Sequence, residues 1–150
     1  PLDMIASGPA APDSSTCAQA LAVAEKYHLT LSTQARALLG PDKLIGVSAH
    51  TVEEALLAEK QGADYLGVGA VFPTSSKSDV GEMSYETLKA ICKAVSIPVV
   101  AIGGISGENV GKLAGSGICG VAVISAIYAA KDVKAAAADL KTTVKEMLRA

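Results

Sequence analysis

Two short motifs hold the residues best suited to bind an anion. Gly103-Gly104-Ile105 and Ile124-Ser125-Ala126 each end an apolar, β-branched stretch of the chain. Glycine allows backbone amides to approach a ligand closely, and a helix beginning near Ser125 would direct its first N–H groups and its dipole at the same point. Gly103 and Gly104 also fit a plain tight turn. Because the two motifs end consecutive stretches, together they predict a phosphate site.

A second candidate site is the loop that follows Phe72. It holds three hydroxyl residues and a lysine, namely Thr74, Ser75, Ser76 and Lys77. These side chains can donate hydrogen bonds and a positive charge to a phosphate or pyrophosphate. A solvated turn is the alternative interpretation, but the position directly after an apolar stretch favours a ligand.

Ser48 and His50 end the first apolar stretch. Alternation along a strand places both on the same side, where a histidine can act as an acid or base near neutral pH. His50 also fits an ordinary hydrogen-bonded residue at a strand end. The carboxylates of Asp64, Asp79 and Glu82 suggest Mg²⁺, but their spacing forms no convincing ligand set. The sequence therefore predicts no metal ligands.

The elements that must position these residues alternate regularly. Apolar stretches predict strands within residues 44–49, 65–72, 98–105 and 120–127. Their nearly continuous apolar character is typical of parallel strands covered on both faces. Segments of helical period separate them, and this alternation predicts a parallel α/β architecture. Ligands of such folds bind at the carboxyl ends of the strands, where all the candidate residues lie.

The helices are marked by caps and apolar stripes. Thr51 and Glu54 form a capping box, and Gly62 is placed to end the helix that follows them. Ser106 is expected to cap a helix that runs to about residue 114, and a last helix is expected to start near Asp132. Between the second and third strand stretches, one helix is expected to carry an apolar stripe of Tyr85, Leu88, Ile91, Cys92 and Val95. The stripe expected on the last helix comprises Val133, Ala137, Leu140, Val144 and Leu148.

Composition limits the class of protein. The 150 residues are 50% hydrophobic and 19% charged, with a net charge of −2, which is typical of one globular domain. Few aromatic residues and no basic excess argue against nucleic-acid binding. No apolar run is long enough for a membrane span, and the first residues do not resemble a signal peptide. Cys17, Cys92 and Cys119 lack metal-binding spacing, so we expect Cys92 and Cys119 to be small buried residues in a reducing cytoplasm.

The chain divides into two parts. Residues 1–30 form a divergent N-terminal segment with one possible helix over Cys17 to Tyr27. Residues 31–150 resemble the thiamine phosphate synthase family through ARALLGPDKLIGVSAHT, EEALLAEKQGADYLGVGAVFPTSSK, IPVVAIGGI and GVAVISAI. The combination of GVSAHT, VFPTxxK and AIGGI is fairly specific, whereas GADY and IGGI recur in many phosphate-binding barrels.

The resemblance implies a fold and an activity. The fold would be an α/β barrel of the (β/α)8 TIM-barrel type, of which this chain shows the C-terminal half, with four to five β/α units. The activity would be that of a transferase joining hydroxymethylpyrimidine pyrophosphate to thiazole phosphate with Mg²⁺, giving thiamine phosphate and pyrophosphate. Lys77 and Ser48 would contact the pyrophosphate. The thiazole phosphate would be held by Thr74, Ser75, Ser76, Gly103, Gly104, Ile124 and Ser125.

Two other functions remain open. A related thiazole tautomerase shares the fold and uses a histidine in proton transfer, and His50 lies in the matching stretch; PTSSK and ISAI fit the synthase better. A non-catalytic phosphate-binding protein is the third possibility. It arises because the QLREK-like, N-D and H-x-G-Q strands of the family, which carry its metal ligands, are not found here.

Four parallel strands cannot close a barrel and leave two unpaired edges. We therefore expect the chain to be part of a longer polypeptide, or to pair with a second copy or a partner half. Its other expected partners are small phosphorylated substrates.

Overall fold

The computed structural model describes residues 40–73 and 83–149. Its centre is a parallel sheet in the order β1-β2-β3-β4, formed by β1 (Gly46–Ala49), β2 (Tyr65–Val68), β3 (Val99–Ile102) and β4 (Gly120–Ala122). One strand lies within each of the four apolar stretches, which confirms the predicted parallel α/β architecture. Thr74, Ser75, Ser76, Lys77, Asp79, Glu82 and the expected helix over residues 17–27 lie outside the described residues.

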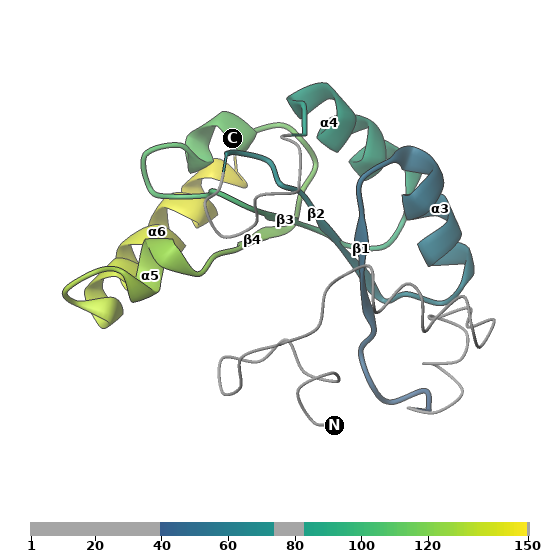
Figure 1. Cartoon of the computed structure of the whole chain (residues 1–150), viewed down its shortest axis with the longest axis horizontal. Coiled ribbons are helices and arrows are strands. Elements are labelled where there is room, and N and C mark those ends of the chain that lie inside the picture. The colour runs from purple at the N-terminus through teal and green to yellow at the C-terminus, as the bar shows by residue number, and fades with distance from the viewer. Residues whose placement is uncertain (1–39, 74–82, 150) are drawn as a thin grey trace.

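The helices follow the strands in alternation. They are α3 (Val52–Lys60), α4 (Tyr85–Ala94), the 3₁₀ helix η2 (Val110–Leu113), the short α5 (Ser125–Tyr128) and α6 (Val133–Met147). Figure 1 shows α3 and α4 above one side of the sheet and α5 and α6 beside β4. Among the described helices, none is long and apolar enough to cross a membrane.

Thr51 and Asp132 cap α3 and α6, with one rearrangement at Thr51. The Thr51 hydroxyl accepts a hydrogen bond from Glu54 N at 3.1 Å, and an Asp132 carboxylate oxygen accepts one from Ala135 N at 2.9 Å. Glu54 Oε2 accepts from His50 N at 2.7 Å rather than from Thr51 N, so only half of the capping box forms. Gly62, at φ +91°, follows the end of α3 as predicted.

Several expectations were wrong in detail. In the stripe of the last helix, Val133 and Leu148 are exposed, and the buried residues of α6 are Leu140 and Met147. Ser106 does not cap a helix; its N–H donates to Asn109 Oδ1 at 2.8 Å, and only η2 forms. Glycines at 107 and 111 disfavour an α-helix there. The helix expected near Ser125 forms as α5, but β4 ends at Ala122, well before the end of the fourth apolar stretch. Cys92 and Cys119 were both expected to be buried, but Cys92 is half-buried and Cys119 is exposed. Cys119 precedes β4, which has no second neighbour in the described sheet.

The core lies between the sheet and the helices. Leu66, Val68 and Ala101 of the strands are fully buried, and Leu88 and Ile91 of the predicted α4 stripe pack into the same cluster. Burying one such leucine contributes about 1.5–3 kcal/mol.

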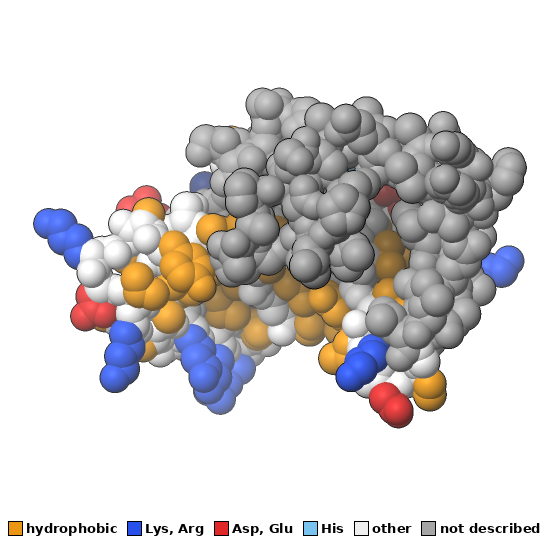
Figure 2. Space-filling model, turned by 60° about the horizontal axis from the view of Figure 1, so that its bottom comes forward, with side chains coloured by type: hydrophobic (Ala, Val, Ile, Leu, Met, Phe, Trp, Pro, Cys, Tyr) orange, Lys and Arg blue, Asp and Glu red, His pale blue; other side chains and the backbone are white. Residues whose placement is uncertain are grey.

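The opposite face of the sheet is not covered by any described helix. Ser48, Tyr65 and Ile102 alternate with buried neighbours and are exposed among the described residues. Figure 2, in which the underside comes forward, shows hydrophobic side chains gathered on that side of the molecule.

The amino ends of the strands are tied together. Ile45 N donates to Asp64 Oδ2 at 2.6 Å, while Asp64 N donates to Ile45 O at 2.8 Å. Glu59 Oε1 of α3 accepts from Ser96 N at 2.8 Å and from Ser96 Oγ at 2.6 Å, just before β3. The hydrogen bonds from Ser96 hold the pKa of Glu59 below its ordinary value. The side chains at the amino ends of the strands therefore stabilise the fold. The candidate site residues lie at the carboxyl ends.

Candidate functional site

A cavity of about 190 Å³ lies at the carboxyl ends of the four strands. We call it the strand-end cavity. Its lining comes from β1, from β2 and the residues after it, from β3 and its glycine loop, and from β4 and the start of α5. The residues are Ser48, His50, Gly67, Gly69, Ala70, Ile102, Gly103, Gly104, Ile105, Ala122, Val123, Ile124 and Ser125.

Every predicted site residue within the described ranges lines this cavity. Ser48 and His50 come from the end of β1, and Gly103 and Gly104 from the loop after β3. Ile124 and Ser125 come from the start of α5. The structure thus brings together residues that lie more than 70 positions apart in the sequence, because parallel strands present their carboxyl ends at one edge.

Positions 103 and 104 require glycine for both conformational and steric reasons. Gly103 has φ +99° and Gly104 has φ +62°, in the left-handed region that side chains disfavour. A Cβ on Gly103 would lie 2.6 Å from the Ala70 Cβ, and one on Gly104 would strike the Pro73 and Phe72 carbonyls. Gly103 and Gly104 therefore do form a tight turn. The same turn also brings backbone directly to the cavity wall.

The segment after β2 is hydrogen-bonded to the end of β3 and the glycine turn. Val71 N donates to Ile102 O at 3.1 Å, and Phe72 N donates to Gly103 O at 3.2 Å. Pro73 is the last described residue before the hydroxyl and lysine loop. The described chain thus lies against the glycine turn as far as Pro73.

Sequence reasoning missed the small residues that form the cavity floor, Gly67, Gly69, Ala70 and Ala122. A Cβ on Gly67 would meet no atom within 4 Å, so the floor is open there, whereas a Cβ on Gly69 would strike the Ile102 backbone. The signal was available in the alternating glycines of YLGVGA. Their missing side chains leave space above the sheet.

His50 is the titratable residue among the cavity-lining residues. Its Nδ1 lies 3.4 Å from Glu54 Oε2, and the two side chains are 52% and 53% exposed. The same carboxylate oxygen accepts from His50 N, so Glu54 holds both backbone and ring at the end of β1. An imidazole in this position can transfer protons to or from a ligand in the cavity.

The described lining carries no lysine, arginine or carboxylate. Within residues 40–73 and 83–149, no group of three His, Cys, Asp or Glu side chains is placed to hold a metal ion. Asp64, one of the carboxylates considered above, is engaged at the opposite edge of the sheet. Donors from the described lining are thus backbone amides, hydroxyls and the His50 imidazole, which suit an anion.

Fold and cavity define an α/β protein of the (β/α)8-barrel type, with four strands among the described residues and an open site at the strand carboxyl ends. A family model described as thiamine monophosphate synthase matches residues 18–127. The chain belongs to that family.

Individual relatives agree with this assignment. The chain is 57% identical over 105 residues to a thiamine-phosphate synthase of Clostridium tetani, a match that covers 70% of this chain and 50% of the relative. It is 52% identical over 110 residues to a thiamine-phosphate synthase of Pyrococcus abyssi, covering 73% and 53%. The chain spans about half the length of these relatives.

A solved structure shows the same arrangement in space. The thiamine phosphate pyrophosphorylase of Pyrococcus furiosus superposes with a TM-score of 0.71 at 45% identity. The superposition covers 78% of this chain and 55% of that one. The predicted barrel-type fold and family resemblance are both confirmed.

Proposed function

We propose that the chain acts in thiamine phosphate synthesis, as a transferase coupling hydroxymethylpyrimidine pyrophosphate to thiazole phosphate and releasing pyrophosphate. The observation that carries the proposal is the strand-end cavity, in which six of the expected site residues meet. Membership in the family supplies the reaction, and the cavity supplies a place for a phosphate.

The glycine turn and the start of α5 are assigned to the thiazole phosphate. Gly103, Gly104, Ile124 and Ser125 line one side of the cavity. The first amides of a helix have no acceptor within it, and backbone N–H groups beside a glycine turn are good phosphate ligands. Thr74, Ser75 and Ser76 are assigned to the same phosphate, because their loop starts beside Gly104.

Ser48 and Lys77 are assigned to the pyrophosphate of the pyrimidine substrate. Ser48 lies on β1 at one edge of the sheet, whereas Ser125 follows β4 at the other edge. Negative charge develops on the departing pyrophosphate as its bond to the pyrimidine carbon breaks. A hydroxyl and an ammonium group placed at that point stabilise the charge more in the transition state than in the substrate.

The magnesium ion implied by the family does not fit the described residues. No described cluster of carboxylates or histidines faces the cavity, so no step of the proposal uses the ion. We propose that its ligands come from outside the described residues, in the same way as the rest of the pyrimidine pocket.

The open face of the sheet leads to a proposal about assembly. Ser48, Tyr65 and Ile102 lie on the face that a closed barrel would enclose. We propose that a second copy or a partner half completes the barrel in solution, in a reducing cytoplasm. Light scattering tests this: a well-behaved monomer at micromolar concentration would count against pairing.

A coupling assay tests the proposed reaction. The purified chain is incubated with both substrates and Mg²⁺, and thiamine phosphate is measured, while thiazole phosphate binding is measured alone. Product formation that depends on both substrates supports the proposal. Binding without product would favour the non-catalytic alternative for this chain.

A tautomerase-like function is the second candidate, and the His50–Glu54 pair is the observation that favours it. In that case isomerisation of a thiazole phosphate would need no pyrimidine substrate. His50→Ala would abolish isomerisation but leave coupling largely intact. The two candidates are thereby separated by one variant measured in two assays.

A further inference from the structure

Asn109 makes two hydrogen bonds to the glycine turn and the residue that follows it. Its Oδ1 accepts from Ser106 N and its Nδ2 donates to Gly104 O, each at 2.8 Å. It is the single asparagine of the chain, is partly buried, and directly precedes η2. It is not among the residues that line the strand-end cavity.

The bond to the Gly104 carbonyl sets the direction of the next amide. In a trans peptide, C=O and the following N–H point in opposite directions. Because Asn109 holds the Gly104 carbonyl outside the cavity, the Ile105 N–H points the other way, toward the wall that Gly104 and Ile105 form. Phe72 does the same for the preceding peptide, because its N–H holds the Gly103 carbonyl and thereby turns the Gly104 N–H.

Both amides therefore point away from Phe72 and Asn109, neither of which lines the cavity. Left-handed φ values of +99° and +62° at Gly103 and Gly104 make two successive peptide reversals possible. Successive N–H groups directed into one concavity form an anion-binding nest. Within the described chain, neither the Gly104 nor the Ile105 amide donates to a carbonyl or side chain.

We propose that Asn109 is a positioning residue that orients the Ile105 N–H for a phosphate oxygen in the strand-end cavity. The inference rests on the proposed function, since it takes the cavity ligand to be the thiazole phosphate. Asn109 does not touch the ligand. Its contribution is to prevent the peptide between Gly104 and Ile105 from rotating and presenting a carbonyl to the anion.

Two substitutions remove the donor of Asn109, and the first of them keeps its acceptor. Asn109→Asp keeps an oxygen for Ser106 N but removes the donor to Gly104 O. Asn109→Ser is neutral and also lacks a donor that reaches Gly104 O. Glu108→Gln is the matched control, because Glu108 is an exposed neighbour in the same turn.

The experiment is a titration of ¹⁵N-labelled protein with thiazole phosphate, followed by amide chemical shifts and by calorimetry. In the unsubstituted protein the Gly104, Ile105 and Ser125 amides should shift together. In both Asn109 variants the Ile105 shift should be largely lost while that of Ser125 remains. Affinity should fall about five- to tenfold, the size expected for one well-placed hydrogen bond. In turnover assays KM should rise with little change in kcat, and Glu108→Gln should resemble the parent.

The outcomes separate the two proposals. If the unsubstituted protein does not bind thiazole phosphate, the proposed function and this inference both fail. If it binds but the Ile105 amide does not shift, the inference alone is overturned, and this result requires no variant to fold. Equal affinity in folded variants would also overturn it.

Discussion

Gly104→Ala should both destabilise the protein and weaken phosphate binding. Gly104 has φ +62°, and an added Cβ would lie 2.7 Å from the Phe72 carbonyl oxygen and closer still to that of Pro73. Both obstacles are backbone atoms, which cannot rotate away as a flexible side chain would. The turn must therefore open, or the segment that leads to the hydroxyl and lysine loop must move.

The size of the effect follows from two contributions. A left-handed backbone conformation costs a residue with a side chain about 1–2 kcal/mol. Overpacking against fixed neighbours adds about 1–3 kcal/mol. The sum is about 2–5 kcal/mol in the free energy of unfolding, which for a domain of this size lowers Tm by roughly 4–20 °C. Displaced Gly104 and Ile105 amides should weaken thiazole phosphate binding about tenfold or more.

Thermal unfolding and calorimetry measure the two effects, and Gly107→Ala is the matched control. Gly107 follows in the same loop, has no atom within 4 Å of an added Cβ and has no left-handed φ. It should therefore leave Tm and affinity nearly unchanged. A Gly104→Ala protein as stable as its parent, with the same affinity, would refute the reasoning about the turn.

Three further predictions concern side chains. Ser48→Ala should lower kcat/KM about tenfold through loss of one hydrogen bond to the pyrophosphate, with Tm unchanged because Ser48 is exposed. Glu59→Gln should lower Tm at pH 7, because hydrogen bonds from Ser96 hold the Glu59 pKa below its unfolded value of 4.5. The stabilisation by the Glu59 carboxylate is present above pH 4.5 and is lost as pH falls through the folded pKa. Burial, followed by the nearby Cys119, raises the pKa of Cys92 to about 11, so Cys92 should be alkylated more slowly than exposed Cys119 at pH 8, and stability should fall as pH rises above 9.0.

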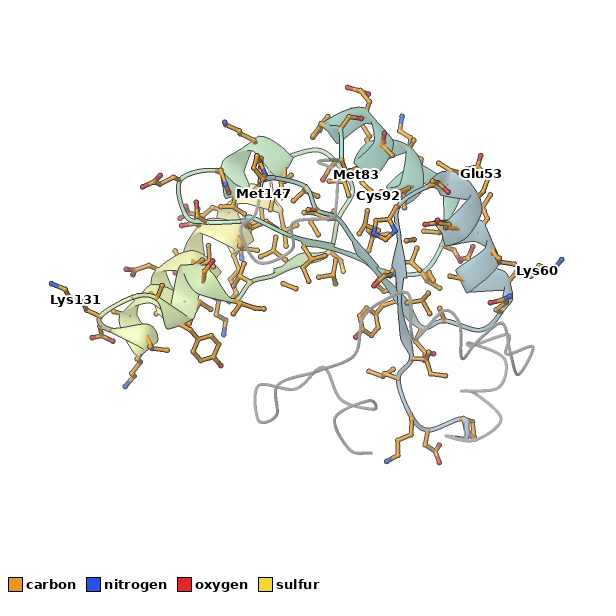
Figure 3. All side chains as sticks on the ribbon, in the orientation of Figure 1. Glu53, Lys60, Met83, Cys92, Lys131 and Met147 are labelled. Atoms are coloured by element: carbon orange, nitrogen blue, oxygen red, sulfur yellow. The ribbon has the colours of Figure 1, made fainter. Side chains whose placement is uncertain are left out.

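Controls make these predictions specific. Glu53→Gln tests for a general charge effect, since Glu53 is exposed on α3 (Figure 3). A Tm difference for Glu59→Gln that persists unchanged at pH 3 would contradict the linkage argument. The alkylation experiment uses a Cys17→Ser background, with Cys92 on α4 as shown in Figure 3. Equal rates in the folded protein would show that Cys92 is not protected. Unchanged turnover in Ser48→Ala would remove Ser48 from the site.

The sequence predicts the strands, and the strand ends that bear the site, because both are marked by local sequence patterns. β-branched stretches place β1 to β4, and glycine at 103 and 104 marks a left-handed turn directly after β3. Thr51 and Asp132 predict the starts of α3 and α6 because a capping side chain contacts amides only three residues away. Order along a parallel sheet then brings the strand ends together.

Features that depend on contacts between distant segments were not predictable. The role of Asn109 depends on the position of the Gly104 carbonyl after the turn has formed. Ser106 looked like a cap because the pattern alone does not show that Asn109 will bind its amide instead. Asp64 looked available for a metal, but its carboxylate is used by Ile45 N, 19 residues earlier in the sequence.

The most direct test of the account is a crystal structure of the protein with thiazole phosphate bound. The account predicts that the phosphate occupies the strand-end cavity, with its oxygens at hydrogen-bond distance from the Gly104, Ile105 and Ser125 amides. A phosphate bound elsewhere, or one in the cavity that makes no contact with these amides, would contradict it.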